Sequence, residues 1–355
     1  MDRTIAYAVD PSLSADCGRS GRGSAFGVSS GVMMRRTMLR AMLRSGAMRI
    51  AILGSGGVGG YYGGRLAAAG EDVVFIARGR HLAAMRERGL RIESPLGNVH
   101  LPTVRATDDP TTVGPVDIVF FTVKLYDTES ALAMLPSLVG PCTLVVPFQN
   151  GVDSVGSLTR AVGAEHVAGG TTYIVSVVAE PGVIKHGALG RLVFGALNGS
   201  RPAPLVHLLE ACQRAKIEAV LSERINVDIW SKFARLTVFS GMTSVARLPL
   251  GPLRKDPEVR ALMEAALRES VAVGKARGVP LPDSLVADIM DSLITMPAGS
   301  RSSMLEDLEH GRRLELPWLS GTMARLGKEV GVPTPIHQFI ATILAPHVNG
   351  TPTIA

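Results

Sequence analysis

A glycine-rich turn beginning at residue 54 constrains the fold of this chain more than any other feature. The apolar run 48–53 leads directly into Gly-x-Gly-x-x-Gly, and an alanine-rich segment follows. The first glycine permits a tight strand-to-helix turn, the second permits backbone to approach a pyrophosphate, and the third permits helix and strand to touch. The sequence therefore predicts a dinucleotide-binding turn, formed by Gly54, Ser55, Gly56, Gly57, Val58 and Gly59.

The end of the second predicted strand, residues 72–76, indicates which dinucleotide binds. NAD sites usually carry Asp or Glu there, which accepts a hydrogen bond from the ribose 2′-hydroxyl. This chain has Ala-Arg-Gly-Arg-His instead, without an acid. A guanidinium can bind a 2′-phosphate through two parallel hydrogen bonds, so we expect NADPH as the cofactor and Arg78 as its ligand. The alternative is that Arg78 and Arg80 are solvated charges at the start of a surface helix.

Residues 48–197 alternate predicted strands and helices, which is typical of a Rossmann-like domain. The continuous apolar runs 117–123 and 143–147 fit parallel strands that are buried on both faces. In open α/β sheets the ligand lies beyond the carboxyl ends of the strands, so Lys124 and Asn150 are expected to contact the cofactor. We expect residues 105–115 to form a connecting loop.

Beyond residue 198 the apolar spacing becomes helical and no further strand is expected. Helices are predicted at 205–216, 224–245, 257–277, 284–295 and 316–330. The predicted fold class is therefore α/β, a Rossmann-like dinucleotide-binding domain followed by an all-helical C-terminal domain. The domain limits are 48–199 for the NADP-binding domain and 200–348 for the helical substrate domain, with the substrate between the two domains.

The first 47 residues are expected to form a disordered extension, rich in Gly, Ser and Arg. An organelle transit peptide and a start codon assigned too far upstream both remain open for it. The extension carries seven of the arginines against three aspartates, whereas the remainder holds 30 basic and 28 acidic residues. The formal net charge of +6 therefore indicates no nucleic-acid partner.

Other sequence features limit the location and the cofactors. No apolar run is long enough to span a membrane, so no membrane partner is expected. The three cysteines are scattered, which favours a reducing compartment such as the cytoplasm. Metal-ligand spacings are absent from the sequence, so no metal is expected. The sequence leaves open whether the chain forms a homodimer.

Six motifs in sequence order together resemble the ketopantoate reductase (2-dehydropantoate 2-reductase) family over about residues 48–346. They are the glycine turn, Ala-Arg-x-x-His-Leu at 77–82, Lys124, Gln-Asn-Gly at 149–151, Trp230-x-Lys232, and Ser-Ser-Met-Leu-x-Asp at 302–307 followed by Glu315. The resemblance implies reduction of 2-dehydropantoate to pantoate by NADPH, a cytoplasmic step toward pantothenate and coenzyme A.

The resemblance also implies roles for individual residues. Lys232 corresponds to the catalytic lysine, and Asn150 to the asparagine between nicotinamide and substrate. Ser303 corresponds to a substrate-binding serine. Glu315 corresponds to the carboxylate near the nicotinamide ribose and the reacting centre, so it counts both as catalytic and as cofactor-binding. A lysine can serve as the acid that protonates the keto oxygen. Without the resemblance, a solvated helix lysine is the alternative for Lys232.

The same helix departs from the family pattern. Leu236 and Ser240 stand where the family carries asparagines that face the substrate. Ser240 remains a candidate substrate ligand, but the pocket is expected to be less polar. Two alternatives to ketopantoate reduction follow: a related NADP-dependent reductase for a more apolar 2-keto acid, and a non-catalytic NADP-binding sensor. Retention of Lys232 and Glu315 argues against the sensor. The sequence does not indicate whether the reaction runs as reduction or oxidation in the cell.

Overall fold

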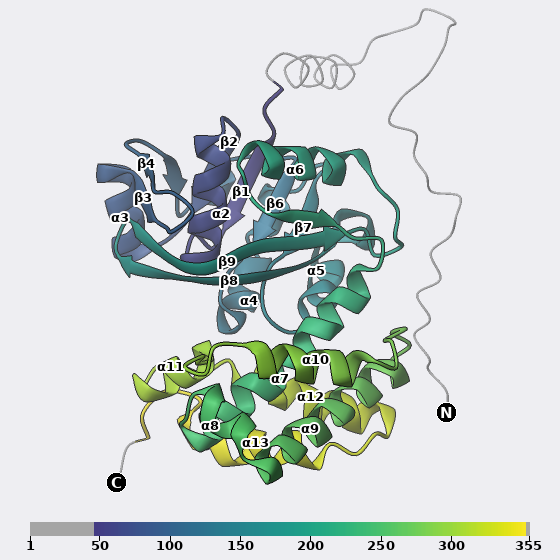
Figure 1. The fold of residues 1–355 in the computed structure, drawn as a ribbon. Coiled ribbons are helices and arrows are strands. Elements are labelled where there is room, and N and C mark those ends of the chain that lie inside the picture. Colours follow the sequence, from purple (N-terminus) through teal and green to yellow (C-terminus); the bar gives the residue numbers. More distant parts are fainter. Residues whose placement is uncertain (1–45, 353–355) are drawn as a thin grey trace, which may run out of the picture. The chain divides into compact units, whose positions relative to one another are not determined.

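The computed structural model describes residues 46–352 of the 355-residue chain (Figure 1). The predicted disordered extension, residues 1–47, lies outside the described residues except for its last two positions. The described part contains an α/β half followed along the chain by a helical half, so the predicted fold class is confirmed.

A five-stranded parallel sheet forms the centre of the α/β half, with the strand order β5-β2-β1-β6-β7. Its strands are β1 (Arg49–Leu53), β2 (Asp72–Ile76), β5 (Arg105–Thr107), β6 (Ile118–Phe121) and β7 (Leu144–Pro147). All four residues of β6 are buried, as expected for a strand covered on both faces. Residues 105–107 were expected in a loop, but they pair with β2 as the edge strand β5, so that prediction was wrong.

A second sheet packs on the other side of helix α2 (Gly57–Ala68), which contacts strands of both sheets. Glycines on opposite faces of α2 permit this close packing. A Cβ at Gly63 would lie 2.7 Å from Ile52 of the first sheet, and one at Gly60 would lie 2.7 Å from Ile184 of the second. The strands of the second sheet are β3 (Leu90–Glu93), β4 (Val99–Leu101), β8 (Gly169–Glu180), β9 (Val183–Gly195) and β10 (Ala219–Leu221).

Strand β10 corrects the expectation that strands end before residue 200. It pairs in parallel with β9, and helix α6 (Ala203–Arg214) precedes it. Leu205 and Leu208 of α6 are buried in the same apolar cluster as β1 and β9. Residues 203–221 therefore belong structurally to the α/β half, whereas the prediction assigned them to the helical domain.

Three further helices, each of ten residues or fewer, follow strands of the first sheet. They are α3 (Gly79–Arg88), α4 (Thr128–Leu132) and α5 (Ser154–Val162). The short α4 and the longer α5 follow β6 and β7, respectively, and Leu158 of α5 is fully buried. The turns that precede these two helices carry Lys124 and Asn150.

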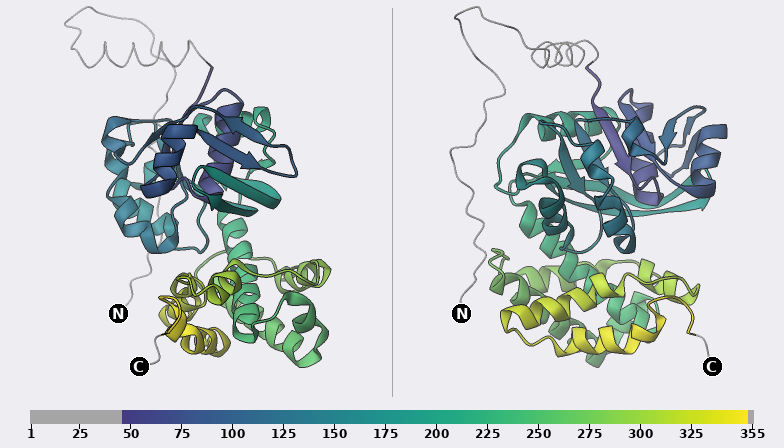
Figure 2. Two further views of the ribbon diagram at one scale, coloured as in Figure 1. Left: turned by 90° about the vertical axis from the view of Figure 1, so that its left-hand side faces the viewer. Right: turned by 180° about the vertical axis from the view of Figure 1, so that it is seen from behind.

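The helical half consists of helices joined by turns (Figure 2), and it has its own apolar core. Its elements are α7 (Ile225–Ala246), α8 (Leu250–Lys255), α9 (Pro257–Ala276), α10 (Leu285–Thr295), α11 (Ser303–Glu309), α12 (Ser320–Val330) and α13 (Pro335–Leu344). Helix α9 begins sharply because Asp256 accepts hydrogen bonds from the backbone N–H groups of Glu258 and Val259, with a proline at the first helical position. No helix within residues 46–352 is long and apolar enough to cross a membrane.

Helix α7 connects the two halves. Its first turns contact β8 and β9, and its later turns contact α9, α11 and α13. Ile225 and Ile229 pack against the start of β8, where a Cβ at Gly169 would lie 2.7 Å from Ile225. The middle of α7, which carries Lys232, is therefore held by both halves.

Candidate active site

Three side chains from distant parts of the sequence form a row of hydrogen bonds, here called the polar row. The Nζ of Lys232 donates to Oδ1 of Asn150 at 3.1 Å. The Nδ2 of Asn150 donates to Oε2 of Glu315, also at 3.1 Å. Because an ammonium group only donates and a carboxylate only accepts, the carboxamide of Asn150 satisfies both neighbours in this orientation alone.

Each member of the polar row is supplied by a different element. Lys232 lies on α7, Asn150 lies in the turn after β7, and Glu315 immediately precedes the 3-10 turn Leu316–Trp318. The side chains of Lys232 and Glu315 are buried, with 8% of each residue exposed. The structure thus brings together three residues that the sequence placed in the site.

Burial changes the acidity of Lys232. Its pKa is lowered to about 7, mainly by desolvation and also by the positive charge of Arg235, whereas Glu315 acts in the opposite direction. A lysine with a pKa near 7 exists in comparable amounts as ammonium and amine at neutral pH. It is therefore able to give up a proton there, which a solvated lysine does poorly.

The glycine turn has the geometry that the fingerprint predicts. Gly54 has a φ of +100°, and a Cβ on it would lie 2.6 Å from the backbone nitrogen of Val123. A Cβ on Gly59 would lie 2.3 Å from the carbonyl oxygen of Gly54. Gly56 differs, because nothing lies within 4 Å of the Cβ position. Two glycines are thus needed for close packing, and the third faces open space.

The remaining residues of the turn are held by their neighbours. The Oγ of Ser55 donates to the carbonyl oxygen of Ile76 at 3.1 Å, and a Cβ on Gly57 would lie 2.3 Å from the carbonyl oxygen of Ser176. Val58 packs on the apolar cluster of the α/β half. These three residues accordingly offer a ligand their backbone rather than a free polar side chain.

His81, from the Ala-Arg-x-x-His-Leu motif, supports this turn. The backbone N–H of Gly182 donates to Nδ1 of His81 at 3.1 Å, so Nε2 carries the proton and donates to the carbonyl oxygen of Ser55 at 2.9 Å. Burial lowers the pKa of His81, although its hydrogen bond to Ser55 acts against the shift. His81 is therefore neutral, and its two hydrogen bonds connect the glycine turn to the β8–β9 hairpin.

Arg78 is exposed and lies at the start of α3, where the sequence placed it, but it has an ion-pair partner. Its Nη2 lies 2.7 Å from Oδ2 of Asp127, a residue in the turn after β6. Three-quarters of the Arg78 side chain is exposed. An incoming phosphate would therefore compete with Asp127 for this guanidinium.

Lys124 lies near the polar row. Its Nζ is 4.0 Å from Oδ2 of Asp307. Burial by itself would lower the pKa of Lys124, but Glu315, Asp307 and Tyr126 outweigh burial, so the pKa is raised. Lys124 thus remains a cation at neutral pH, as a phosphate or carboxylate ligand requires.

The two predicted substrate serines have different surroundings. The Oγ of Ser240 donates to the carbonyl oxygen of Leu236 at 2.6 Å, within its own helix, and Ser240 is buried. The structure therefore does not support Ser240 as a free donor for substrate, because its only hydrogen is already used. Ser303 is exposed at the first turn of α11, while its neighbour Ser302 caps this helix through a hydrogen bond from the backbone N–H of Leu305.

Sequence reasoning missed two residues beside Lys232. The Nζ of Lys232 lies 5.8 Å from the ring centroid of Tyr173 on β8, and the guanidinium carbon of Arg235 lies 5.2 Å from the same centroid. Arg235 had a usable signal, since residues three apart on a helix share a face. Tyr173 had none, because its strand lies nearly 60 positions away in the sequence.

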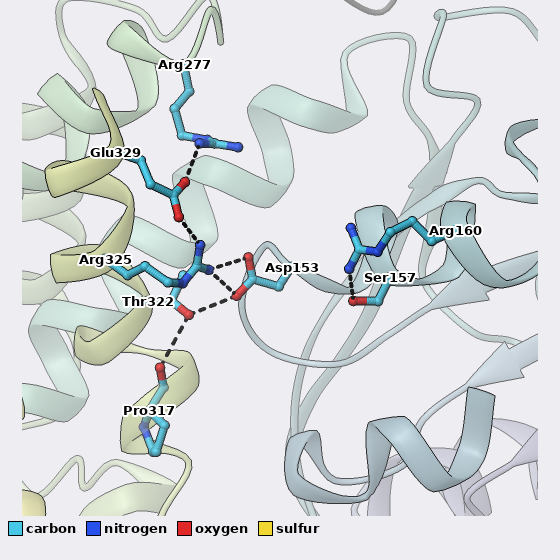
Figure 3. Close-up of polar contacts among 8 residues, drawn as sticks. All are labelled: Asp153, Ser157, Arg160, Arg277, Pro317, Thr322, Arg325 and Glu329. Atoms are coloured by element: carbon cyan, nitrogen blue, oxygen red, sulfur yellow. Dashed lines mark hydrogen bonds and ion pairs between the residues drawn. The ribbon is translucent and has the colours of Figure 1, made fainter. Parts of the chain in front are cut away.

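Sequence reasoning also missed a set of polar contacts that holds the turn after β7. This set, here called the Asp153 clasp, is formed by Asp153, Thr322 and Arg325 (Figure 3). The Nη2 of Arg325 lies 2.8 Å from both carboxylate oxygens of Asp153, and the Oγ1 of Thr322 donates to Oδ2 at 2.9 Å. Glu329 accepts from the other terminal nitrogen of Arg325 at 2.6 Å. Asn150 lies three residues before Asp153, so the clasp fixes one end of the turn that carries it.

Most of the chain matches two models of one protein family. Residues 50–199 match the family model described as Ketopantoate reductase PanE/ApbA, and residues 224–347 match the model described as Ketopantoate reductase PanE/ApbA C terminal. The chain belongs to the ketopantoate reductase family. It is therefore an oxidoreductase of a family that acts on 2-keto acids with a nicotinamide cofactor, and the alternative of a non-catalytic sensor is set aside.

Individual relatives match more than four-fifths of the chain. A 2-dehydropantoate 2-reductase from Mesorhizobium japonicum is 30% identical over 313 residues, which cover 81% of this chain and 94% of the relative. An uncharacterized oxidoreductase, YkpB, from Bacillus subtilis is 31% identical over 294 residues, with 82% and 96% covered. The crystal structure of a family member from Ralstonia eutropha is 34% identical, with a TM-score of 0.77 and coverage of 84% and 98%.

The family fold also carries other substrates. The structure of a D-mandelate dehydrogenase with NADH and anilino(oxo)acetate matches with a TM-score of 0.77 at 22% identity, over 84% of this chain and 98% of that one. At that identity the likeness concerns the fold alone. Membership in the ketopantoate reductase family therefore leaves the individual 2-keto acid to be argued from the site.

Proposed function

We propose that this protein uses NADPH to reduce the keto group of a 2-keto acid, and that 2-dehydropantoate, which yields pantoate, is its first candidate substrate. The observation that supports this most is the polar row, in which the buried Lys232 has a pKa of about 7 and contacts Asn150. Such a lysine is suited to protonate a keto oxygen at neutral pH.

The glycine turn fits the cofactor. Gly56, at the N-terminus of α2, provides no capping side chain, so the first N–H groups of the helix have no side-chain acceptor. The space beside Gly56 is open, and helix N-terminal N–H groups are suited to bind a pyrophosphate. Gly54, Ser55, Gly57, Val58 and Gly59 would form the rest of this cradle. When bound, NADPH supplies the hydride that reduces the keto carbon.

Residues of the chain stabilise the negative charge that develops on the keto oxygen and supply the proton. We propose that Lys232 donates a hydrogen bond to the keto oxygen, stabilises the negative charge that develops there, and transfers its proton to give the 2-hydroxy acid. Asn150 holds the ammonium group in position, and Glu315 holds Asn150 in its one satisfied orientation. The neutral amine of Lys232 then regains a proton from solvent, because a pKa of about 7 leaves a substantial fraction of this lysine protonated at neutral pH.

The preference for NADPH rests on the basic residues around the end of β2. No acidic residue occupies the end of this strand, and Arg78 is exposed there. A 2′-phosphate carries more charge than the single carboxylate of Asp127 and accepts two parallel hydrogen bonds. We propose that Arg78 leaves Asp127 for the 2′-phosphate when NADPH binds.

A more apolar 2-keto acid is the second candidate substrate. Leu236 offers no polar atom, and the hydroxyl of Ser240 donates within α7. A hydroxyl-bearing substrate would find fewer partners here, and a buried unpaired hydroxyl costs about 1–3 kcal/mol. A 2-keto acid with a hydrocarbon tail avoids that cost. Ser303 would remain available to either acid, because it is exposed.

One assay separates these possibilities. The purified protein is mixed with NADPH or NADH and with 2-dehydropantoate, 2-ketoisovalerate, 2-ketoisocaproate or phenylpyruvate, and oxidation of the cofactor is followed. Turnover of the bulkier acids alone would exclude 2-dehydropantoate, and no turnover with any acid would exclude the reductase. In the Lys232→Ala variant, turnover should be lost while NADPH affinity is nearly unchanged.

Two further properties belong to the same proposal. We propose that the enzyme acts in the cytoplasm, because its cofactor pool and its few scattered cysteines suit a reducing compartment. We also propose that it forms a homodimer. A structural neighbour from Staphylococcus aureus is described as a dimeric ketopantoate reductase, and light scattering on the purified chain tests this point.

A further inference from the structure

Arg235 is a cation beside Lys232, and no acid within residues 46–352 forms an ion pair with it. It lies three residues after Lys232 on α7, so both side chains leave the same face of the helix. The ring of Tyr173 lies 5.8 Å from Nζ of Lys232 and 5.2 Å from Cζ of Arg235, measured to the ring centroid. The two positive groups therefore share one aromatic neighbour. Nζ of Lys232 and Cζ of Arg235 can lie no farther apart than the sum of their distances to the ring centroid of Tyr173.

The guanidinium of Arg235 contacts an aromatic ring rather than a carboxylate. Across residues 46–352, no Asp or Glu oxygen lies within ion-pair distance of it, and it lies over the ring of Tyr173. Asp228, two turns earlier on α7, accepts a hydrogen bond from Ser222 instead. By contrast, Lys124 and Arg312 both face Asp307. Arg235 is half-buried, and a half-buried cation without a counter-charge gains strongly from an anionic ligand.

The chemistry of the substrate supplies that anion. In a 2-keto acid the carboxylate is bonded directly to the keto carbon. If the keto oxygen contacts Lys232, the carboxylate lies one bond further away, within reach of a side chain from the next helical turn. A guanidinium binds a carboxylate through two parallel hydrogen bonds, a geometry that an ammonium group does not offer.

Two other side chains of α7 offer no free hydrogen-bond donor for the substrate carboxylate. At position 236 the side chain is an apolar Leu, and at 240 the hydroxyl is used within the helix. We propose that Arg235 binds the carboxylate of the 2-keto acid and thereby makes the enzyme selective for acids over their neutral derivatives. This inference rests on the proposed function, because it places the keto oxygen at Lys232.

The test compares an acid with its uncharged ester. NADPH oxidation is measured for wild type, Arg235→Met, Arg235→Gln and Arg235→Lys with 2-ketoisovalerate and with its methyl ester at pH 6, where Lys232 is protonated in every variant. In Arg235→Met and Arg235→Gln, kcat/KM for the acid should fall about 50-fold, mainly through KM, while kcat/KM for the ester changes less than threefold. Arg235→Lys should retain part of the preference for the acid.

The control is Arg247→Met, which removes an exposed arginine from the C-terminal end of the same helix and should leave both substrates unaffected. Circular dichroism and NADPH affinity show whether each variant is folded, and the Gln and Lys variants replace the Met variant if it is not. A parallel loss with acid and ester would overturn the proposal, because it would show a structural role. An unchanged preference for the acid would overturn it as well.

A binding measurement separates this inference from the proposed function. Oxamate, an unreactive carboxylate of the same shape as pyruvate, is titrated calorimetrically into the NADPH-saturated proteins. If wild type reduces no 2-keto acid, the proposed function fails, but about 50-fold weaker oxamate binding in Arg235→Met still supports the carboxylate site. Equal oxamate affinity in wild type and Arg235→Met overturns it.

Discussion

At the scale of single residues, the proposed reduction depends on the state of one buried amine. Lys232 is surrounded by groups that act in opposite directions, since burial and Arg235 lower its pKa and Glu315 raises it. The net pKa of about 7 lies where proton transfer to a keto oxygen is efficient. The catalytic role of Lys232 is a prediction that the sequence supports through the resemblance, but its pKa could not be predicted, because it depends on burial.

The first prediction concerns pH. Because Lys232 must carry a proton to act as the acid, kcat/KM for reduction should be level at pH 5.5–6.5. Above pH 7 it should fall about tenfold per unit, as the lysine loses its proton in the free enzyme. Initial rates of NADPH oxidation between pH 5.5 and 9.5 check this. A profile that stays flat to pH 9 would contradict the assignment.

The second prediction concerns Arg78 and Asp127, which form an exposed ion pair. Arg78→Ala should weaken NADPH binding about 10- to 100-fold, because charge-assisted hydrogen bonds to the phosphate are lost, and leave NADH binding within twofold. Asp127→Asn should strengthen NADPH binding several-fold, since the competing carboxylate is removed. Fluorescence titration of both cofactors measures these changes. Equal weakening of NADPH and NADH in Arg78→Ala would remove Arg78 from the 2′-phosphate site.

The ion pair of Arg78 also shows that a sequence does not reveal the interaction partner of a residue. The absence of an acid after β2 is visible at once, yet Asp127 contributes one from the turn after β6, 49 positions later. The same is true of Ser240, whose donor is used by a carbonyl one helical turn away. Residue types indicate which donors, acceptors and charges a site contains. Which of them are already bound to other residues of the protein depends on the fold.

At the scale of elements, the turn after β7 is fixed at both ends. Asn150 is held by Lys232 and Glu315, and Asp153 is held in the Asp153 clasp by Thr322 and Arg325 (Figure 3). The third prediction is that Arg325→Ala lowers kcat about tenfold, because a small displacement of Asn150 misplaces the acid. The free energy of unfolding should fall by only about 0.5–1 kcal/mol, since this ion pair is substantially exposed.

The matched control for the clasp is Arg268→Ala, which breaks the exposed pair with Glu264 on α9, away from the turn. It should cost similar stability and no activity. Steady-state kinetics and urea denaturation of both variants give the comparison. If Arg325→Ala loses stability but keeps its kcat, the clasp is only a structural contact.

The longest helices were predictable from the sequence, whereas the shortest strands were not. Strand β2 has the predicted limits, and α7 and α9 lie within one residue of theirs, because their apolar periodicity extends over many residues. The strands β5 and β10 were missed, since three residues carry too little pattern to distinguish a strand from a loop. Both are edge strands of their sheets, so their pairing depends on the neighbour rather than on their own sequence.

At the scale of the whole molecule, stability depends on a histidine that takes no part in the proposed reaction. His337 on α13 is fully buried, and its Nε2 lies 2.8 Å from Oγ of Ser270. Burial lowers the pKa of His337 to about 4, although a hydrogen bond to the carbonyl oxygen of Ala266 acts against the shift. The folded protein therefore holds this side chain neutral at pH 5 and above.

The fourth prediction follows from that pKa. The unfolded chain protonates His337 near pH 6.5 and the folded chain only near pH 4, so the unfolded state binds more protons between these values. The contribution of His337 to stability is therefore full above pH 6.5 and is lost as the pH falls, by about 2–3 kcal/mol at pH 4.5. Urea midpoints at pH 7 and 4.5 should differ less for His337→Gln than for wild type. An equal acid loss in both proteins would contradict this origin.

The polar row has a consequence for how the enzyme acquires its activity during folding. Its two hydrogen bonds join residues that lie 82 and 165 positions apart along the chain, and the row forms only when α7 has docked against both halves. Contacts between residues so distant in sequence form late, because closing long loops costs chain entropy. On refolding from urea, helical signal and cofactor binding should therefore return before turnover does. The recovery of turnover marks the moment at which the two halves of the molecule have joined.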